Sequence, residues 1–132
     1  MDYVHIDESR FPIVVFDFSS REPTFAEFEA YLKKTESYYA REIPLSFILD
    51  GTKSRFLTTE LRIRQAQWMK DNAPIIKKYQ KGIAFILPNI MSRIILKGIL
   101  LIEPIPAPFI VVSSFDEALQ WTQQQLANGS VN

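Results

Sequence analysis

The 132-residue sequence contains no cysteine and a single histidine, His5. Without cysteine the chain cannot form a disulfide, use a thiolate nucleophile or hold a metal through sulfur. One histidine near the N-terminus also argues against a structural zinc site. Glycine is scarce, with four residues, and neither a glycine-rich phosphate loop nor an HExxH pattern occurs. We therefore predict no metal, no cofactor, no catalytic residue and no enzymatic activity.

Long hydrophobic runs are missing as well. The apolar stretches are too short to span a bilayer, and the N-terminus MDYVHIDESR lacks the apolar core of a secretory signal. We expect a cytoplasmic protein without a transmembrane segment. The length and the hydrophobic content of 47 % suit a single domain over residues 1–132, with mobile ends at about 1–8 and 128–132.

The net charge is zero, but the charges are divided unevenly along the chain. The segment from Lys53 to Lys97 contains ten basic and two acidic residues, a net charge of +8, so the remainder carries −8. Folding can separate these segments onto two faces or interleave them so that their fields partly cancel. Arginine and aromatic residues do not alternate on any strand as a single-strand nucleic-acid platform requires, so we expect no nucleic-acid partner.

Strand patterns and helix patterns alternate along the chain. Four apolar runs, FPIVVFDF, LSFILD, GIAFIL and PFIVVS, are typical of strands, and YVHID before the first run can supply an antiparallel partner. Helices are expected from Thr24, from about Thr58, over residues 89–102 and from Ser114. In the second of these helices Trp68 belongs to the buried stripe, and Pro74 should kink or restart the helix.

This order of elements predicts an α/β fold. Its sheet should be mostly parallel, with four to five strands, an N-terminal antiparallel strand or hairpin, and about four helices packed on it through right-handed crossovers.

Several segments also carry a family resemblance. They are PIVVFDFSSREPTFAEFEAYL, FILDGTKSRFLTTEL, the apolar segment after GIAFILPN, and PAPFIVVSSFDEALQWTQQQL. With the order of the elements, they resemble the STAS-like, or SpoIIAA-like, domains of bacteria over nearly the whole chain. The resemblance implies a non-enzymatic regulatory domain that acts by binding a protein partner or another copy of itself.

The resemblance also points to the start of the second helix. In the anti-sigma factor antagonists that define this fold, a serine or threonine there accepts phosphate from a partner kinase, so Thr58 and Thr59 are candidate phosphoacceptors by position. The chain departs from the family's Asp-Ser-Ser-Gly-like pattern, since Leu57, Glu60 and Leu61 surround the two threonines. Glu60 suits a helix start but would repel a neighbouring phosphate. The alternative interpretation is that Thr58 is an N-cap.

Two carboxylates follow neighbouring strands. Asp17 and Asp50 would lie at the rim of the sheet where open α/β folds commonly bind ligands, and a close pair could bind a cation or transfer protons. A small enzyme would need the two groups within a few ångströms of each other in an open pocket. A single acidic residue at a strand end is more often a turn or cap former.

The segment NIMSRIILKGILLIEP, residues 89–104, has apolar residues on more than one side. A helical projection sets Leu96 and Leu100 outside, beside Arg93 and Lys97. Two leucines bordered by two cations form a candidate surface for a protein partner, an acidic lipid surface or a twin subunit. The predicted inner side consists of Ile90, Met91, Ile94, Ile95, Gly98, Leu101 and Ile102.

A different class of function remains open at the same helix. STAS-like domains resemble lipid-transfer folds in topology, so the protein could carry an apolar small molecule or lipid in a cleft under helix 89–102. An apolar cavity beneath that helix would favour the carrier. A convex patch around Leu96 and Leu100 would favour docking.

Overall fold

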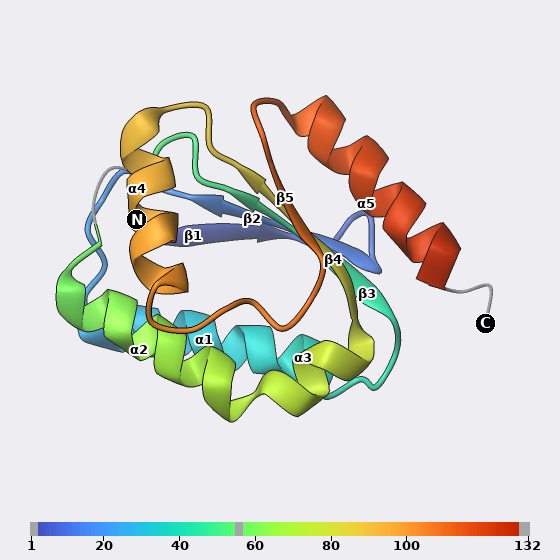
Figure 1. Cartoon of the computed structure of the whole chain (residues 1–132), viewed down its shortest axis with the longest axis horizontal. Coiled ribbons are helices and arrows are strands. Elements are labelled where there is room, and N and C mark those ends of the chain that lie inside the picture. The colour runs from blue at the N-terminus through green and yellow to red at the C-terminus, as the bar shows by residue number, and fades with distance from the viewer. Residues whose placement is uncertain (1–2, 55–56, 130–132) are drawn as a thin grey trace.

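A five-stranded mixed sheet forms the centre of the protein, whose computed structural model describes residues 3–54 and 57–129. The strands lie in chain order, β1-β2-β3-β4-β5; β1 is antiparallel to β2, and β2 to β5 are parallel (Figure 1). The predicted α/β class and the antiparallel N-terminal strand are confirmed. The strands are β1 (Val4–Asp7), β2 (Ile13–Phe18), β3 (Leu45–Asp50), β4 (Gln80–Ile86) and β5 (Phe109–Val112).

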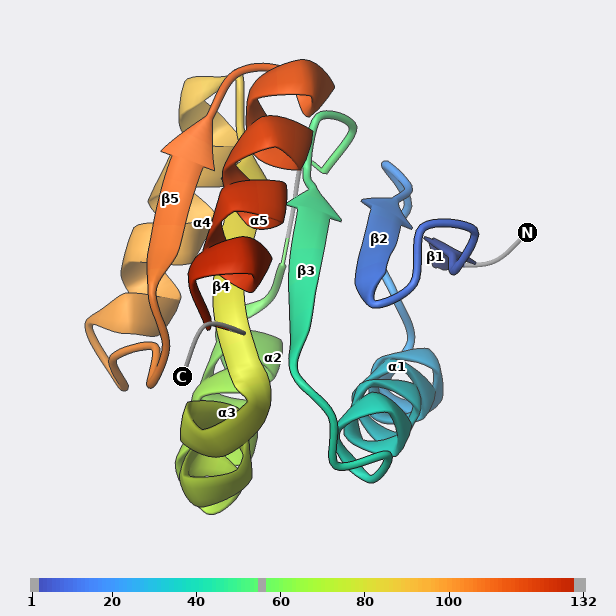
Figure 2. The ribbon, with the colours of Figure 1, turned by 90° about the vertical axis from the view of Figure 1, so that its right-hand side faces the viewer.

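The helices cover the two faces of the sheet unequally. Because three crossovers step across the sheet in one direction with one hand, their helices α1 to α4 share a face, and α5 alone covers the other (Figure 2). They are α1 (Phe25–Tyr39), α2 (Thr59–Asp71), α3 (Ala73–Tyr79), α4 (Ile90–Leu100) and α5 (Phe115–Gly129).

Local sequence signals account for several helix boundaries. Thr24 forms the predicted capping box with Glu27, in which each side chain accepts a hydrogen bond from the other residue's backbone N–H. Pro74 lies in the first turn of α3, where its missing N–H is harmless, so the predicted helix restarts after Asn72. This restart gives five helices instead of about four.

The N-terminal residues are tied into the sheet. Val4–Asp7 pairs with Val15–Phe18, and the Tyr38 hydroxyl donates a hydrogen bond to the carboxylate of Glu8. The range expected to be mobile, residues 1–8, therefore contains a strand. The remaining ends of the predicted mobile segments, residues 1–2 and 130–132, lie outside the described residues.

Alternation along the strands divides the interior into two cores. Successive side chains point to opposite faces, so Val14 and Phe16 face α1 to α4, whereas Ile13 and Val15 face α5. The buried hydrophobic residues of the core under α5 are aliphatic, and Gly82 of β4 leaves space for the Trp121 ring of α5. The other core is rich in aromatic rings and contains the cavity.

Candidate functional site

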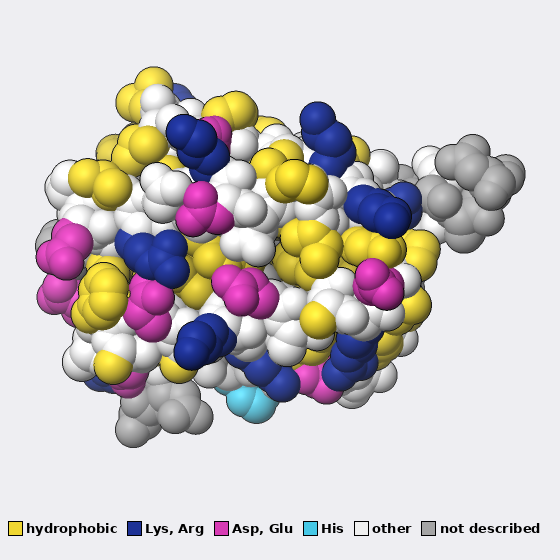
Figure 3. All heavy atoms as spheres, turned by 90° about the horizontal axis from the view of Figure 1, so that it is seen from below, with side chains coloured by type: hydrophobic (Ala, Val, Ile, Leu, Met, Phe, Trp, Pro, Cys, Tyr) yellow, Lys and Arg dark blue, Asp and Glu magenta, His cyan; other side chains and the backbone are white. Residues whose placement is uncertain are grey.

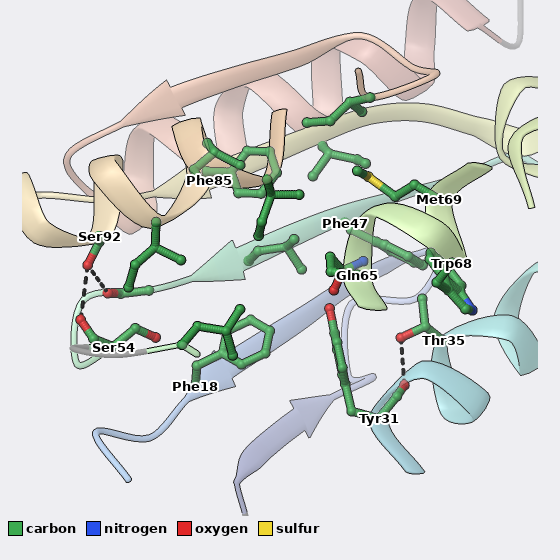
Figure 4. A pocket seen from close by; sticks show the side chains of 18 of the residues that line it. Phe18, Tyr31, Thr35, Phe47, Ser54, Gln65, Trp68, Met69, Phe85 and Ser92 are labelled. Atoms are coloured by element: carbon green, nitrogen blue, oxygen red, sulfur yellow. Dashed lines mark hydrogen bonds between the residues drawn. The ribbon is translucent and has the colours of Figure 1, made fainter. Parts of the chain in front are cut away.

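A largely apolar cavity of about 170 Å³ lies between the sheet and the helices α1 to α4 (Figure 4). The strands supply its floor through large side chains that alternation turns toward this face. α1 and α2 supply aromatic and sulfur-containing walls, and α4 supplies aliphatic side chains above. Its apolar lining includes Phe18, Phe47, Leu49, Ile83 and Phe85 from strands, Tyr31, Trp68 and Met69 from α1 and α2, and Ile95, Leu96, Ile99 and Leu100 from α4.

Hydrogen bonds to a neighbouring loop fix the rotation of α4. The side chain of Asn89 caps the helix by accepting from the Ser92 backbone N–H at 2.9 Å. The buried Ser92 hydroxyl lies 3.0 Å from the carbonyl oxygen of Gly51 and 3.1 Å from that of Ser54 (Figure 4). Because Ser92 must face this loop, the residues one and two turns later also face inward.

The predicted faces of α4 are therefore wrong. Leu96 and Leu100 are half-buried and line the cavity, so they do not form one outward surface with Arg93 and Lys97. The two cations are exposed, as predicted. Most of the side chains assigned to the core are instead exposed, namely Ile90, Met91, Ile94, Leu101 and Ile102.

Trp68 forms one wall of the cavity and is buried, as its place in the α2 stripe predicted. Its indole Nε1 donates to Glu36 Oε1 on α1 at 2.8 Å, so the ring joins α2 to α1. Asn72, one turn after Trp68, donates from its side-chain amide to the Trp68 carbonyl at 2.9 Å.

Few polar groups face the cavity. Gln65 of α2 lines it, and within the described residues its amide makes no hydrogen bond. The Tyr31 ring extends from α1 toward Gln65 (Figure 4). Burial raises the pKa of Tyr3, Tyr31 and Tyr39 well above that of an exposed phenol, so all three are neutral at physiological pH.

One charged residue, Arg21, is found among the described residues that line the cavity. Its guanidinium donates to both carboxylate oxygens of Glu27, at 2.8 and 2.6 Å. This pairing, with the backbone N–H of Thr24, lowers the pKa of Glu27 to about 2. The Arg21 guanidinium is thus already paired with the Glu27 carboxylate. The lining of the cavity therefore favours a neutral ligand over a charged one.

The two candidate phosphoacceptors lie at the start of α2. Thr58 is the N-cap, as the alternative interpretation predicted: its extended backbone (φ −61°, ψ 157°) lets Oγ1 accept from the Leu61 N–H at 3.2 Å. Thr59, the first helical residue, is exposed. The Arg62 side chain ties the helix to the residue before its cap by donating from Nε to the Leu57 carbonyl at 2.9 Å. Neither threonine lines the cavity.

The carboxylates considered for catalysis come from neighbouring strands, since Asp17 of β2 and Asp50 of β3 are paired in register. Asp17 lies 3.5 Å from the Lys53 ammonium group, and Asp50 Oδ1 accepts from the Thr52 N–H at 3.0 Å. Both groups thus serve the turn after β3, and neither lines the cavity.

Comparisons with protein-family models, with curated proteins and with solved structures found no match. Within residues 3–54 and 57–129, every helix is too short or too polar to cross a membrane.

Proposed function

We propose that the protein binds a neutral, mainly apolar small molecule in the cavity beneath α4, and so acts as a carrier or ligand-binding protein. The observation that carries this proposal is the apolar lining, to which the sheet and the four helices α1 to α4 contribute. A dry cavity of about 150 Å³ lined by aliphatic and aromatic side chains admits benzene. The present cavity, at about 170 Å³, is of that class.

The polar groups narrow the ligand chemistry. A charged ligand would have to leave water for a lining whose cation is already paired with Glu27, which is unfavourable. The Gln65 side chain offers an NH₂ group as hydrogen-bond donor and a carbonyl oxygen as acceptor in mainly apolar surroundings. A ring or chain with a single hydroxyl or carbonyl group matches these features best.

The test uses three aromatic probes that differ in one group: naphthalene, 1-naphthol and 1-naphthoate. Their binding can be followed by fluorescence on the purified protein. We expect naphthalene and 1-naphthol to bind and the anionic naphthoate to bind at least about tenfold more weakly. Replacing Gln65 with Leu should weaken 1-naphthol relative to naphthalene by about fivefold, the value of one neutral hydrogen bond.

A matched pair of variants on α4 locates the probe. Leu96→Phe adds volume inside the cavity, whereas Leu101→Phe makes the same change on a side chain that is 88 % exposed. Leu96→Phe should reduce affinity by about tenfold, and Leu101→Phe should leave it unchanged. Equal affinities for the two variants, or no binding by the unmodified protein, would refute a ligand site in this cavity.

The assignment to the STAS-like domains is part of the proposal. It is supported by the order of the elements and by the antiparallel strand at the edge of an otherwise parallel sheet. Phosphorylation of Thr58 or Thr59 stays a prediction, to be checked by mass spectrometry of the protein from its own host. A phosphate on Thr58 would occupy the oxygen that now caps α2, so it would alter the helix start.

A further inference from the structure

The outer face of α4 exposes apolar side chains to an unusual degree. Leu101 is 88 % exposed and Ile90 is 73 % exposed, and between them Met91 and Ile94 are about half exposed, at 54 % and 48 %. Ile102 extends the same apolar surface in the following turn, at 51 %. We call these five residues the α4 outer face. Most isolated exposed hydrophobic residues need no explanation, but a group of this size on one helix marks an interaction site.

The segment after α4 does not cover this face. Residues 103–108 could have folded back over the helix, but Ile105 and Pro106 turn inward and line the cavity. α4 packs against α2 on its inner side, and the outer side remains at the edge of the helical layer (Figure 1). The α4 outer face is therefore available to another surface.

Cations accompany these apolar side chains. Arg93 is exposed while its Nε donates to the Leu87 carbonyl at 2.8 Å, so its position beside the apolar residues is fixed. Lys97 follows one turn later and is exposed as well. Arg62 of α2 reaches the same helix, since a Cβ built on Gly98 would lie 3.4 Å from its Nη1. α4 itself contains no acidic residue; Glu103 follows it in the next turn.

The rest of the helical layer differs in this respect. Seen from below, where α1, α2 and α3 lie, acidic and basic side chains are interspersed around the hydrophobic atoms (Figure 3). On α4 the charges are of one sign. A partner that matches the α4 outer face would therefore offer an apolar region to the hydrophobic side chains and negative charges to the cations beside them.

A second copy of the chain fits these requirements poorly. Two α4 helices packed around a twofold axis would bring two Arg93 and two Lys97 side chains into one small contact, without an acid on either helix. One face of an 11-residue helix is also small beside the roughly 20–30 residues that each partner contributes to a standard protein interface. An anionic bilayer has neither problem, since apolar side chains enter its acyl region while cations remain among the headgroups.

We propose that the α4 outer face docks the protein on an anionic lipid surface, with Ile90, Ile94 and Leu101 entering the bilayer and Arg93 and Lys97 contacting the lipid headgroups. This inference concerns the outside of α4 and does not depend on what the cavity binds. The same helix forms part of the cavity lining on its inner side, so docking would place a lipid-soluble ligand close to its site.

Vesicle co-sedimentation tests the proposal with the full chain. The unmodified protein should bind vesicles of phosphatidylcholine mixed with phosphatidylserine, bind pure phosphatidylcholine more weakly, and dissociate as salt is raised. The triple variant Ile90→Ser, Ile94→Ser, Leu101→Ser should bind at least about tenfold more weakly. Lys97→Gln should weaken binding to the anionic vesicles by about fivefold, the contribution expected of one cation near such a surface.

Matched controls are available away from α4. Ile43, 38 % exposed in the connection between α1 and β3, and Lys33, exposed on α1, can be changed to Ser and Gln without loss of vesicle binding. Circular dichroism should show that all variants stay folded, since the changed side chains are exposed. Absence of binding by the unmodified protein, equal binding by the triple variant, or loss of binding in the controls would overturn the proposal. So would a concentration-dependent dimer that the triple variant abolishes, since the face would then serve a second copy.

Discussion

The two faces of the sheet use opposite packing. Toward α5, β4 presents the small residues Gly82 and Ala84 among the aliphatic side chains of the other strands, and α5 contributes Ala118 and the buried Thr122. The backbone of α5 approaches β3 and β4 more closely than any helix on the other face approaches a strand. Small residues on both sides allow helix and sheet to approach closely, and the result is a filled core.

The opposite face is built from large residues. β3 and β4 carry Phe47, Leu49, Ile83 and Phe85 on this face. The helices α1 and α2 pack aromatic rings against them. Near β1 and α1 the aromatic rings pack against one another edge to face. The ring centroids of Phe16 and Tyr31, for example, lie 5.9 Å apart. The side chains that α4 contributes are aliphatic, and they leave the cavity between this helix and the sheet unfilled. The comparison indicates that the helix and the sheet approach closely on one face, whereas the other face retains a cavity.

The largest predicted change in the free energy of unfolding comes from a residue on the face with the cavity. Replacing Trp68 with Ala should lower the free energy of unfolding by about 3–5 kcal/mol, because the change enlarges a cavity and removes the bond from Nε1 to Glu36. Urea denaturation measures this loss. With Trp121 replaced by Phe, the remaining emission from Trp68 should be blue-shifted and poorly quenched by iodide.

A loss below about 1 kcal/mol for Trp68→Ala would show that the helical layer collapses into the space left. The cavity would then be a soft region of the core, and the contrast between the two faces would no longer hold.

The second prediction compares two glycines, one from each face. A Cβ on Gly82 would lie 2.8 Å from the Trp121 ring, so Gly82→Ala should cost about 1–3 kcal/mol through overpacking against α5. A Cβ on Gly98 of α4 would lie 3.4 Å from the end of the flexible Arg62 side chain. Gly98→Ala should therefore stabilise the protein by about 0.5–1 kcal/mol through the higher helix propensity of alanine. Thermal and urea unfolding measure both changes.

Similar values for the two glycine variants would contradict the comparison, because they would mean that the α5 face tolerates added volume as well as the surface of α4 does.

The third prediction shows what the two faces share. Thr58 caps α2 on the cavity side, and Ser114 caps α5 by accepting from the Glu117 N–H at 3.3 Å. Either residue changed to Ala should lower the free energy of unfolding by about 0.5–2 kcal/mol, as loss of an N-cap usually does. Thr59→Ala is the control for α2, since Thr59 supplies no cap. An unchanged denaturation midpoint for Thr58→Ala would remove the structural explanation of that threonine and favour the regulatory one.

The sequence predicted the sheet and most of the helices because those signals are local. Apolar runs, capping residues and Pro74 each act within a few positions, so they place the strands, the start of α2 and the restart at α3 correctly. The contrast between the two faces was also readable, since Phe47, Leu49, Ile83 and Phe85 alternate with Ser46, Ile48, Gly82 and Ala84.

The rotation of α4 was not predictable from periodicity. Apolar residues surround this helix on nearly all sides, so the projection could not distinguish the inner face. Ser92 lies on the same row of the helix as Leu96 and Leu100, which the projection set outside, but in the structure it is buried and faces the carbonyl groups of the loop after β3. That contact joins residues about 40 positions apart. Its partners are backbone groups, which every residue has, so nothing in the sequence marks them.

The smallest predicted effect is a pH dependence at the start of α1. Arg21 and the Thr24 N–H hold the pKa of Glu27 at about 2 in the folded protein, against an ordinary value of 4.5. The folded state therefore releases this proton more readily than the unfolded state does, so the contribution of Glu27 to stability is complete above pH 4.5 and is lost as pH falls toward 2. Urea denaturation at several pH values in this window should show a shallower decline for Glu27→Gln than for the unmodified protein. Arg21→Gln should flatten the decline in the same way, because it removes the main cause of the shift. Equal slopes for all three proteins would mean that solvent screens this pair, and the capping box of α1 would then rest on Thr24 alone.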